Sequence, residues 1–294
     1  MEDLQRHMEV SQRRACQVVG QPRSTQRYVA RRPERDRPLL RRMRQLAGRH
    51  PRYGYRRVAA MLREEGWSVN RKRVYRLWRA EGLKVPKRQR KRRHLGCSDN
   101  GVVRRRAERP NHVWSYDFLM DQTSDGRRLK ILPVVDEFTR ENLALEVHRR
   151  MGAAGVIEVL KELVGLRGAP EYLRSDNGPE FIAEAIKAWL RGSGVGTLFI
   201  EPGAPWENAY IESFNGKLRD ELLDREEFGS LLEAKVLASQ YRAEYNHRRP
   251  HSALGYRTPA AFAAAWVPPG LAALGPAEPM REGSEDLTLI TVGT

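Results

Sequence analysis

The hydrophobic pattern of the chain changes near residue 111, and this change limits the folds that the chain can adopt. Up to about Gly82, apolar residues recur three and four positions apart, which is typical of amphipathic helices. From Val113 onward, short runs of β-branched and aromatic residues alternate with longer helical patterns. Strands that alternate with helices favour a mixed sheet with helices on its faces. The sequence therefore predicts a helical front region followed by an α/β domain.

The charge is also unevenly distributed. Residues 1–100 contain 29 Lys and Arg against 9 Asp and Glu, whereas residues 101–294 contain 24 against 28. A basic segment attached to a nearly neutral body favours a nucleic-acid-binding module. A solvated basic arm would explain the charge but not the helical spacing of apolar residues inside it.

Two short helices are predicted within residues 1–33. Ser11 can cap a helix that continues to about Val19, and Ser24 can cap a second helix after a break at Gly20 and Pro22. The second helix would carry Arg27, Tyr28, Arg31 and Arg32. The pair is similar to a small helix-turn-helix, and a plain helical hairpin is an equally good interpretation.

Three longer helices are predicted within residues 34–85. Two of them carry the apolar sets Leu39, Leu40, Met43 and Leu46, and Tyr55, Val58, Ala59 and Leu62. The third begins at the N-cap Asn70 and ends at Gly82. It directs Val74, Leu77 and Trp78 inward and the basic residues Lys72, Arg73, Arg76 and Arg79 outward. Because a recognition helix meets the DNA major groove with such a face, these four are candidate DNA contacts. The alternative is a basic helix that only covers its own core.

Helical spacing disappears in residues 86–109, which contain the basic runs KRQRKRR and RRR. We interpret this segment as an extended cationic linker that can follow a phosphate backbone, with a solvated tether as the alternative.

Residues 110–267 form the predicted α/β core. Strands are predicted at 113–120, 129–135, 142–147, 171–174 and 197–200, with a hairpin turn at 124–126 between the first two. Helices are predicted at 156–164, at 181–190, around Glu212 and at 230–246. Residues 268–294 are rich in Pro, Gly and acidic residues and are predicted to be a disordered tail.

Three acidic residues occur in distinctive sequence surroundings: Asp117 in WSYDF, Asp176 in RSDNGPEF and Glu212 in NAYIESFNGKLRDELL, with 35 residues between the last two. The first is expected in a strand, the second at a strand end and the third on a helix, and these positions can converge. Converging carboxylates hold two divalent cations for phosphodiester chemistry, because Mg²⁺ prefers oxygen ligands. Taken singly, each has an ordinary explanation, as a strand, turn or helix-surface residue.

The helix of Glu212 provides a further candidate. Its apolar stripe consists of Ile211, Phe214, Leu218 and Leu222. Arg219 lies seven positions after Glu212, so the two are expected on one adjacent face, where Arg219 would hold substrate phosphates. A helix-surface ion pair is the alternative for Arg219.

The motifs WSYDF, VVDEFTR, RSDNGPEF, EPGAPWENAYIESFNGKLRDEL and YNHRRPHSALGYRTP together resemble the second-frame transposases of the bacterial insertion-sequence family numbered three, relatives of retroviral integrases. The resemblance covers about residues 11–265. It implies a ribonuclease-H-like core, with a mixed five-stranded sheet flanked by helices, behind a helix-turn-helix-like DNA-binding region. It also implies that Asp117, Asp176 and Glu212 form a DDE triad for two Mg²⁺ ions, with Mn²⁺ as a substitute.

The same resemblance implies partners and further site residues. The partners are double-stranded DNA, a first-frame product joined by frameshifting, and other copies of the chain on DNA. Asn177 and Gly178 would shape the turn beside the metal, and Trp206 and Asn208 would position a loop against a DNA end. Asp136 lacks the triad position and is interpreted as structural or substrate-orienting.

Several classes of function are disfavoured. Cys16 and Cys97 are the only cysteines, so neither a disulfide framework nor a cysteine-rich zinc site is predicted, and His247 and His251 have no cysteine nearby. No apolar run approaches a membrane span, and the N-terminus lacks a secretory signal, so we expect a bacterial cytoplasmic, nucleoid-associated protein.

The sequence thus predicts a transposase that cleaves one strand at an element end and uses the 3′-OH to attack a second phosphodiester. Because the ions would supply both activation steps, Ser115 and Tyr116 are disfavoured as covalent nucleophiles. Two alternatives remain, a DNA-binding regulator without catalysis and a hydrolytic nuclease on the same fold.

Overall fold

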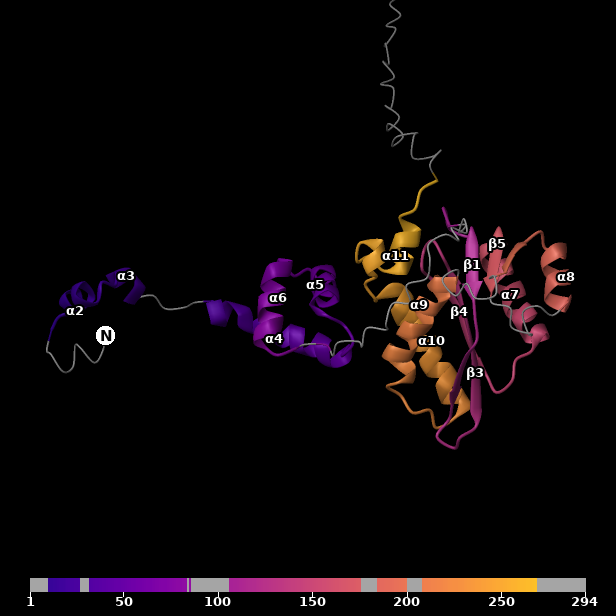
Figure 1. Ribbon diagram of the computed structural model, residues 1–294, viewed down its shortest axis with the longest axis horizontal. Coiled ribbons are helices and arrows are strands. Elements are labelled where there is room, and N and C mark those ends of the chain that lie inside the picture. Colours follow the sequence, from indigo (N-terminus) through magenta and orange to yellow (C-terminus); the bar gives the residue numbers. More distant parts are fainter. Residues whose placement is uncertain are drawn as a thin grey trace, which may run out of the picture. The chain divides into compact units, whose positions relative to one another are not determined.

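The computed structural model describes residues 10–26, 32–83, 85, 106–175, 184–199 and 208–268. The chain forms two compact units, Met1–Arg90 and Lys91–Thr294, and each is described by itself (Figure 1). Among the helices of these residues, none is long and apolar enough to cross a membrane. Most of the predicted linker and all but the first residue of the predicted tail lie outside the described residues, as do Arg27, Tyr28 and Arg31.

The first unit begins with the short helices α2 (Gln12–Val19) and α3 (Arg23–Gln26). Ser11 caps α2 by accepting a hydrogen bond from the Arg14 amide, and Gly20 ends it with a φ of 66°. The prediction that Ser24 caps the second helix is wrong, because α3 starts at Arg23 and its first backbone bonds go to the Pro22 carbonyl. Arg32, also expected in that helix, belongs to the next one.

Three helices follow in the same unit, α4 (Arg32–Arg49), α5 (Tyr55–Glu64) and α6 (Arg71–Ala80). Their apolar residues form one core, as the spacing predicted: Leu39, Met43, Leu46, Val58, Leu62, Val74, Leu77 and Trp78 are all buried. Asn70 caps α6, since its side-chain oxygen accepts a hydrogen bond from the Lys72 amide at 2.7 Å. These three helices correspond to the helix-turn-helix-like region predicted for residues 34–85.

The second unit contains one sheet of six strands among its described residues. They are β1 (Val113–Tyr116), β2 (Leu119–Gln122), β3 (Arg128–Asp136), β4 (Asn142–His148), β5 (Tyr172–Ser175) and β6 (Gly196–Phe199). β4 pairs with one edge of β3, while β1 and β2 lie end to end along the other edge. β5 and β6 extend the sheet from β1 in parallel. The sheet is therefore mixed and five strand positions wide, in agreement with the predicted ribonuclease-H-like arrangement.

The single strand expected at 113–120 is broken at Asp117 and Phe118, so Asp117 does not lie in the middle of a strand. The registers Tyr116↔Val134 and Leu119↔Ile131 are continuous and place Asp117 opposite Pro133. In the same ladder, the amide of Glu137 donates to the Val113 carbonyl. Hydrogen-bonded pairs recur at every second residue of an antiparallel ladder, so the amide of residue 133 would be expected to donate to the carbonyl of residue 117. Proline has no N–H, and the ladder is interrupted there.

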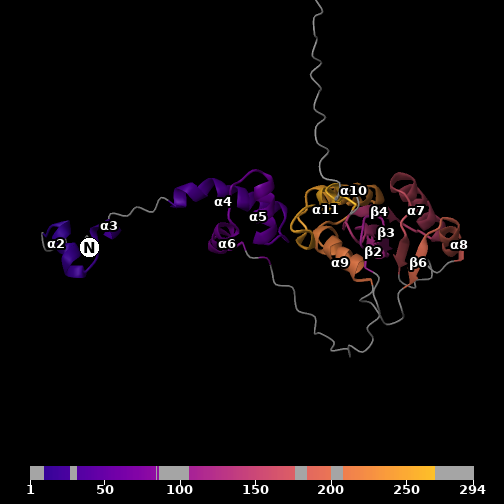
Figure 2. The same cartoon turned by 90° about the horizontal axis from the view of Figure 1, so that it is seen from above.

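Helices cover both faces of the sheet (Figures 1 and 2). On one face, α7 (Ala153–Arg167) and α8 (Glu184–Gly192) pack against Trp114, Tyr116 and Val134. On the other, α9 (Ala209–Leu218) and α10 (Leu231–His247) pack against Leu119, Leu129 and Ile131. A π-helical turn, η2 (Arg219–Leu223), follows α9, and the short helices η3 (Ser252–Leu254) and α11 (Pro259–Ala264) end the described chain. The sheet therefore separates two apolar cores.

Candidate active site

Asp117 follows the last residue of β1 and stands at the break in the ladder, with its side chain half-buried. The carboxylate oxygen Oδ2 accepts a hydrogen bond from Nδ2 of Asn215 at 3.0 Å. Asn215 belongs to α9, so this bond joins the end of the first strand to a helix 98 positions later in the sequence. The break thus leaves an acidic side chain directed at α9.

Glu212 lies on α9, one helical turn before Asn215, and its side chain is exposed. Residues three apart in an α-helix share a face. The bond from Asn215 to Asp117 therefore holds the Glu212 face of α9 at the end of β1. The apolar stripe Ile211, Phe214, Leu218 and Leu222 is buried, as predicted.

Two asparagines at this helix are buried, which is unusual for polar side chains. Asn215 is 8% exposed and Asn208, at the N-cap of α9, is 4% exposed. Within the described part of the chain, the side-chain oxygen Oδ1 of each has no hydrogen-bond partner. Burying an unbonded amide oxygen costs on the order of 1–3 kcal/mol, so these oxygens are suited to a partner that the described residues do not supply.

Asn215 is a further candidate site residue that the sequence patterns did not single out. Asn208, Glu212 and Asn215 are spaced four and three apart, which is a polar stripe beside the apolar one. That spacing was the available signal. What the sequence alone does not show is that the stripe meets Asp117 rather than solvent.

Asp176, Asn177, Gly178 and Trp206 lie outside the described residues. The strand before Asp176 is described: β5 runs parallel to β1, with Ser115 opposite Arg174, and ends at Ser175. Among the residues with described positions, no three His, Cys, Asp or Glu side chains form a group that could hold a metal ion.

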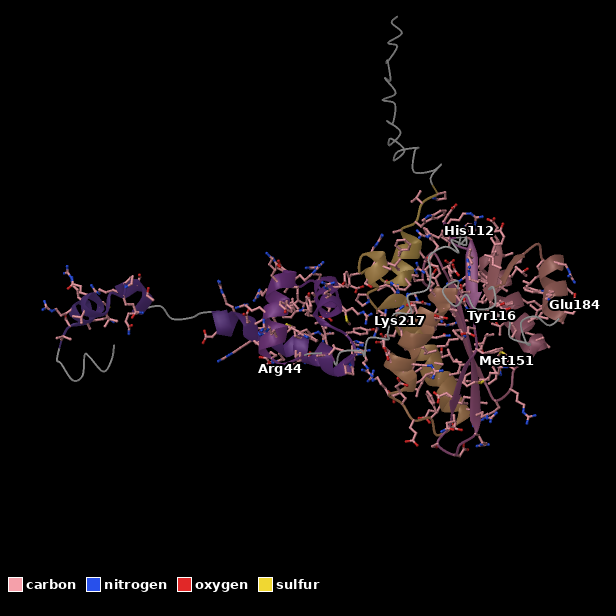
Figure 3. All side chains as sticks on the ribbon, viewed as in Figure 1. Arg44, His112, Tyr116, Met151, Glu184 and Lys217 are labelled. Atoms are coloured by element: carbon pink, nitrogen blue, oxygen red, sulfur yellow. The ribbon has the colours of Figure 1, made fainter. Side chains whose placement is uncertain are left out.

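A buried polar cluster lies beneath the ends of these strands. Arg174 and Glu137 form an ion pair, with Nε 2.9 Å from Oε1, and both side chains are buried. Ser115 Oγ hydrogen-bonds to the same Glu137 oxygen. Tyr116 is 1% exposed and packs on the α7 side of the sheet (Figure 3). Ser115 and Tyr116, the two residues disfavoured as nucleophiles, are thus both shielded from solvent.

Asp136 has a structural environment. Its carboxylate accepts hydrogen bonds from the amides of Asn111, Phe138 and Thr139, at 2.8, 2.8 and 2.9 Å. Burial raises the pKa of this carboxyl above its ordinary value, while the three amide hydrogen bonds oppose that rise. The bonds from Phe138 and Thr139 close the turn between β3 and β4, and the bond from Asn111 joins that turn to the residues before β1.

The basic face of α6 is divided into two pairs of residues. Lys72 and Arg79 are exposed. Arg73 and Arg76 both bond to Asp36 of α4, Arg73 at 2.6 and 2.8 Å and Arg76 at 2.9 Å. Asp36 is 5% exposed, so the two arginines are anchored by a buried carboxylate.

Arg219, the candidate phosphate contact near Glu212, is exposed and is the first residue of the π-helical turn. The seven-residue spacing from Glu212 assumed a continuous α-helix, whereas α9 ends at Leu218. The other basic residue on this helix, Lys217, donates to Ser213 Oγ at 2.9 Å (Figure 3).

Family models match most of the described chain. Integrase core domain models match residues 107–205 and 193–259, and an HTH-like domain model matches residues 33–92. The HTH-like match includes α5, α6 and all but the first residue of α4, while the sheet and α9 lie inside the integrase matches.

Curated relatives come from bacterial insertion elements. The chain is 42% identical over 264 residues to an insertion element IS407 uncharacterized 31.7 kDa protein of Burkholderia multivorans, covering 90% of this chain and 94% of that protein. It is 42% identical over 258 residues to an insertion element IS476 uncharacterized 39.2 kDa protein of Xanthomonas euvesicatoria, covering 88% and 74%. It is 32% identical over 206 residues to the putative transposase InsK for insertion sequence element IS150 of Escherichia coli, covering 67% and 72%. The chain therefore belongs to the insertion-sequence transposases of the family numbered three, with an integrase core behind a helix-turn-helix-like region.

Proposed function

We propose that this transposase cleaves one DNA strand at each insertion-sequence end and transfers the resulting 3′-OH to target DNA, with two divalent cations bound by Asp117, Asp176 and Glu212. The observation that supports this most directly is the hydrogen bond from Asn215 to Asp117. It holds the Glu212 face of α9 at the end of β1, beside the parallel strand whose sequence continues into Asp176.

The residues present fit hard divalent cations. Carboxylate and amide oxygens are the ligands that Mg²⁺ prefers, and Asp117 and Glu212 supply the first kind. The buried Oδ1 of Asn215 supplies the second kind next to Asp117 and has no hydrogen-bond partner among the described residues. When bound, such ions activate the attacking oxygen and stabilise the leaving oxygen.

The side chains of the protein hold this arrangement in place. Asn215 orients the Asp117 carboxylate, and the break opposite Pro133 keeps that carboxylate outside the regular ladder. The buried Arg174–Glu137 pair joins β5 to the end of β3, so it fixes the strand that leads to Asp176. Arg219 and the loop residues Trp206, Asn177 and Asn208 are the proposed contacts to the DNA end.

DNA recognition is proposed for the basic face of α6. Lys72 and Arg79 would meet the phosphates directly, and Arg73 and Arg76 would present their remaining N–H groups from a geometry fixed by Asp36. A first-frame product and further copies of this chain are the proposed protein partners, as in the family to which the chain belongs.

Strand nicking and joining of labelled element-end DNA test the proposal. The Asp176→Ala and Glu212→Gln variants should each lose Mg²⁺-dependent nicking while retaining DNA binding, and chelation of the cation should stop the wild-type reaction. Undiminished nicking by Asp176→Ala would reject the metal assignment. Binding without any nicking by the wild type, with and without a first-frame partner, would instead indicate a DNA-binding regulator.

A labelled target duplex separates strand transfer from simple hydrolysis. The proposed mechanism yields a joined product longer than the donor strand. A nuclease on the same fold would cut the donor strand in Mg²⁺ and never produce that product.

A further inference from the structure

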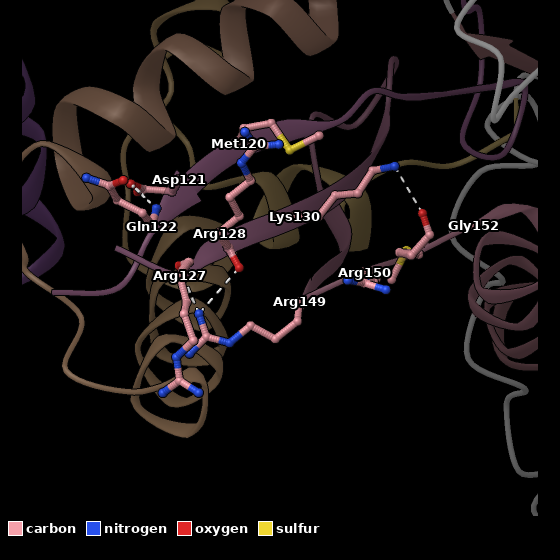
Figure 4. Close-up of a pocket in the computed structure, with 10 residues that line it drawn as sticks. Met120, Asp121, Gln122, Arg127, Arg128, Lys130, Arg149, Arg150 and Gly152 are labelled. Atoms are coloured by element: carbon pink, nitrogen blue, oxygen red, sulfur yellow. Dashed lines mark hydrogen bonds between the residues drawn. The ribbon is translucent and has the colours of Figure 1, made fainter. Parts of the chain in front are cut away.

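A large cation-lined cavity lies on the second unit, on the α7 face of the β2–β3 hairpin (Figure 4). It measures about 1020 Å³. Its lining consists of Met120, Asp121, Gln122, Arg127, Arg128, Lys130, Arg149, Arg150, Met151 and Gly152. Five of these ten residues are basic and one is acidic. None of them belongs to the candidate active site or to the basic face of α6.

The basic side chains reach the cavity because of strand alternation. In β3, Leu129 and Ile131 point into the core beneath α9, so Arg128 and Lys130 point to the opposite face. The cross-strand pairs Met120↔Lys130 and Gln122↔Arg128 put the exposed residues of β2 on the same face. The end of β4 and the following residues supply Arg149 and Arg150.

Three of the arginines keep their charge available. Arg149 bonds only to neutral oxygens, those of Thr123, Arg127 and Arg128, at 2.8, 2.9 and 3.3 Å. Arg128 and Arg150 are exposed, and neither forms an ion pair with any carboxylate of known position. By contrast, Arg127 is paired with Asp125 at 2.6 Å. The cavity therefore holds an excess of positive charge.

The lining identifies the chemical class of the ligand. Pockets for small organic molecules are mainly apolar and aromatic, whereas the only large apolar side chains here are those of Met120 and Met151. A broad hollow lined by guanidinium and ammonium groups suits a chain of phosphates. The adjoining hollow along α7 is lined by Glu146, Glu158 and Glu162 together with Arg150 and Lys161, so it lacks the excess of positive charge found on the hairpin side.

The cavity is also close to the candidate active site along the chain. Lys130 Nζ lies 3.9 Å from the centre of the Phe118 ring, and Phe118 directly follows Asp117. The same Nζ donates to the Met151 carbonyl at 3.0 Å, which holds the β3 side of the cavity to the segment before α7. Phe118 packs on the α7 face whereas Asp117 meets α9, so these two neighbouring residues connect the cavity to the candidate active site across the sheet.

We propose that this cavity binds the sugar–phosphate backbone of duplex DNA through Arg128, Arg149 and Arg150, as a second DNA contact separate from α6. The proposal rests on the proposed function for the presence of DNA near Asp117. The contact is sequence-independent, since it involves phosphates and not base edges.

Photo-cross-linking tests the contact in the full chain. A benzophenone side chain placed at Met120, which is 53% exposed, should cross-link to a 40-bp element-end duplex, whereas the same group at Leu232, which is 73% exposed on α10, should not. The reaction is run in EDTA, so a failure of metal-dependent cleavage would leave its result unchanged. Equal cross-linking at the two positions would overturn the proposal.

A charge-reversal pair supplies a matched control. The Arg128→Glu/Arg150→Glu variant and the Lys161→Glu/Lys235→Glu variant change the net charge equally, and all four residues are exposed. Because the first variant loses two phosphate contacts, the slope of log K for DNA binding against log salt concentration should become less negative by about 2. The second variant should keep the wild-type slope. Equal slopes for the two variants would contradict the proposed contact.

Discussion

Pro133 lies opposite Asp117 in the continuous register that joins β3 to β1 and β2. The missing N–H of the proline interrupts the ladder at Asp117, whose carboxylate accepts a hydrogen bond from Asn215 of α9. A local backbone feature in one strand thus determines the position of an acidic side chain in the next.

Restoring the N–H should disturb the site without weakening the fold. The Pro133→Ala variant can donate to the Asp117 carbonyl, which would draw residues 117 and 118 into the ladder and shift the carboxylate. We expect Mg²⁺-dependent nicking to slow on the order of tenfold, because small misplacements of catalytic groups are costly. Nicking kinetics and thermal unfolding measure the two effects. Pro51→Ala, in the exposed turn before α5, is the control, and an unchanged nicking rate in Pro133→Ala would contradict the argument.

Loss of the side-chain amide of Asn215 should slow DNA nicking. In Asn215→Ala the Asp117 carboxylate loses the donor that orients it, and we expect nicking to fall about 10- to 100-fold, as for groups that orient metal ligands. Ser213→Ala, on the same helix but bonded to Lys217, should retain activity. A larger apparent Mg²⁺ requirement in Asn215→Ala would separate a positioning defect from misfolding, which near-UV circular dichroism would detect. Equal activity of the two variants would remove Asn215 from the site.

Asp36 should contribute strongly to the stability of the helical unit. Its buried carboxylate accepts three hydrogen bonds from two arginines, and bonds to charged groups are worth about 1.5–3 kcal/mol each when broken singly. We expect Asp36→Asn to reduce protection against hydrogen exchange in α4 and α6 by about 1–3 kcal/mol. Glu81→Gln is the comparison, because Glu81 pairs with an Arg44 side chain that is 62% exposed and should matter by less than about 1 kcal/mol. Similar losses in both variants would contradict the special role of Asp36.

The pair Arg42–Glu65 should make the same unit sensitive to acid. The hydrogen bond from Arg42 lowers the pKa of Glu65, so the folded state holds the charged carboxylate more favourably than the unfolded chain does. Its contribution is therefore complete above the unfolded pKa of about 4.3 and is lost as the pH falls through the lower folded value. Hydrogen exchange of α4 and α5 in wild type and Glu65→Gln should differ at pH 7, by less than about 1 kcal/mol because the pair is partly solvated, and converge in acid. A constant difference across this range would show that the charge is not responsible.

Local patterns predicted much of the fold. The N-cap at Asn70, the turn at 124–126 and the buried stripe from Ile211 to Leu222 depend on residues that lie close together in the sequence, and each is present in the structure. Alternation also predicted the mixed sheet. These features follow from short-range chemistry and from the separation of apolar and polar faces.

The remaining features depend on contacts between distant residues. Arg73 and Arg76 have the spacing of an outward face, yet both bond to Asp36. That residue lies 37 positions before Arg73 and 40 before Arg76. The break at Asp117 arises in β3, where Pro133 reads as one apolar residue among several. Asn215 lies beside an apolar stripe and gains its partner only when α9 packs on the sheet. In each case the deciding neighbour comes from another element, so the pattern within one segment cannot show it.

The π-helical turn Arg219–Leu223 has a consequence for how the chain tolerates length changes. Such a turn holds one residue more than an α-helical turn, so its residues are rotated from the positions that a continuous α-helix would give them. Removing one residue from the turn would rotate Glu221 away from its buried partner Arg249, 2.6 Å distant, and leave Glu212 and Asn215 where they are. The part of this segment that carries Glu212 and Asn215 and the part that is anchored by Arg249 can therefore change independently.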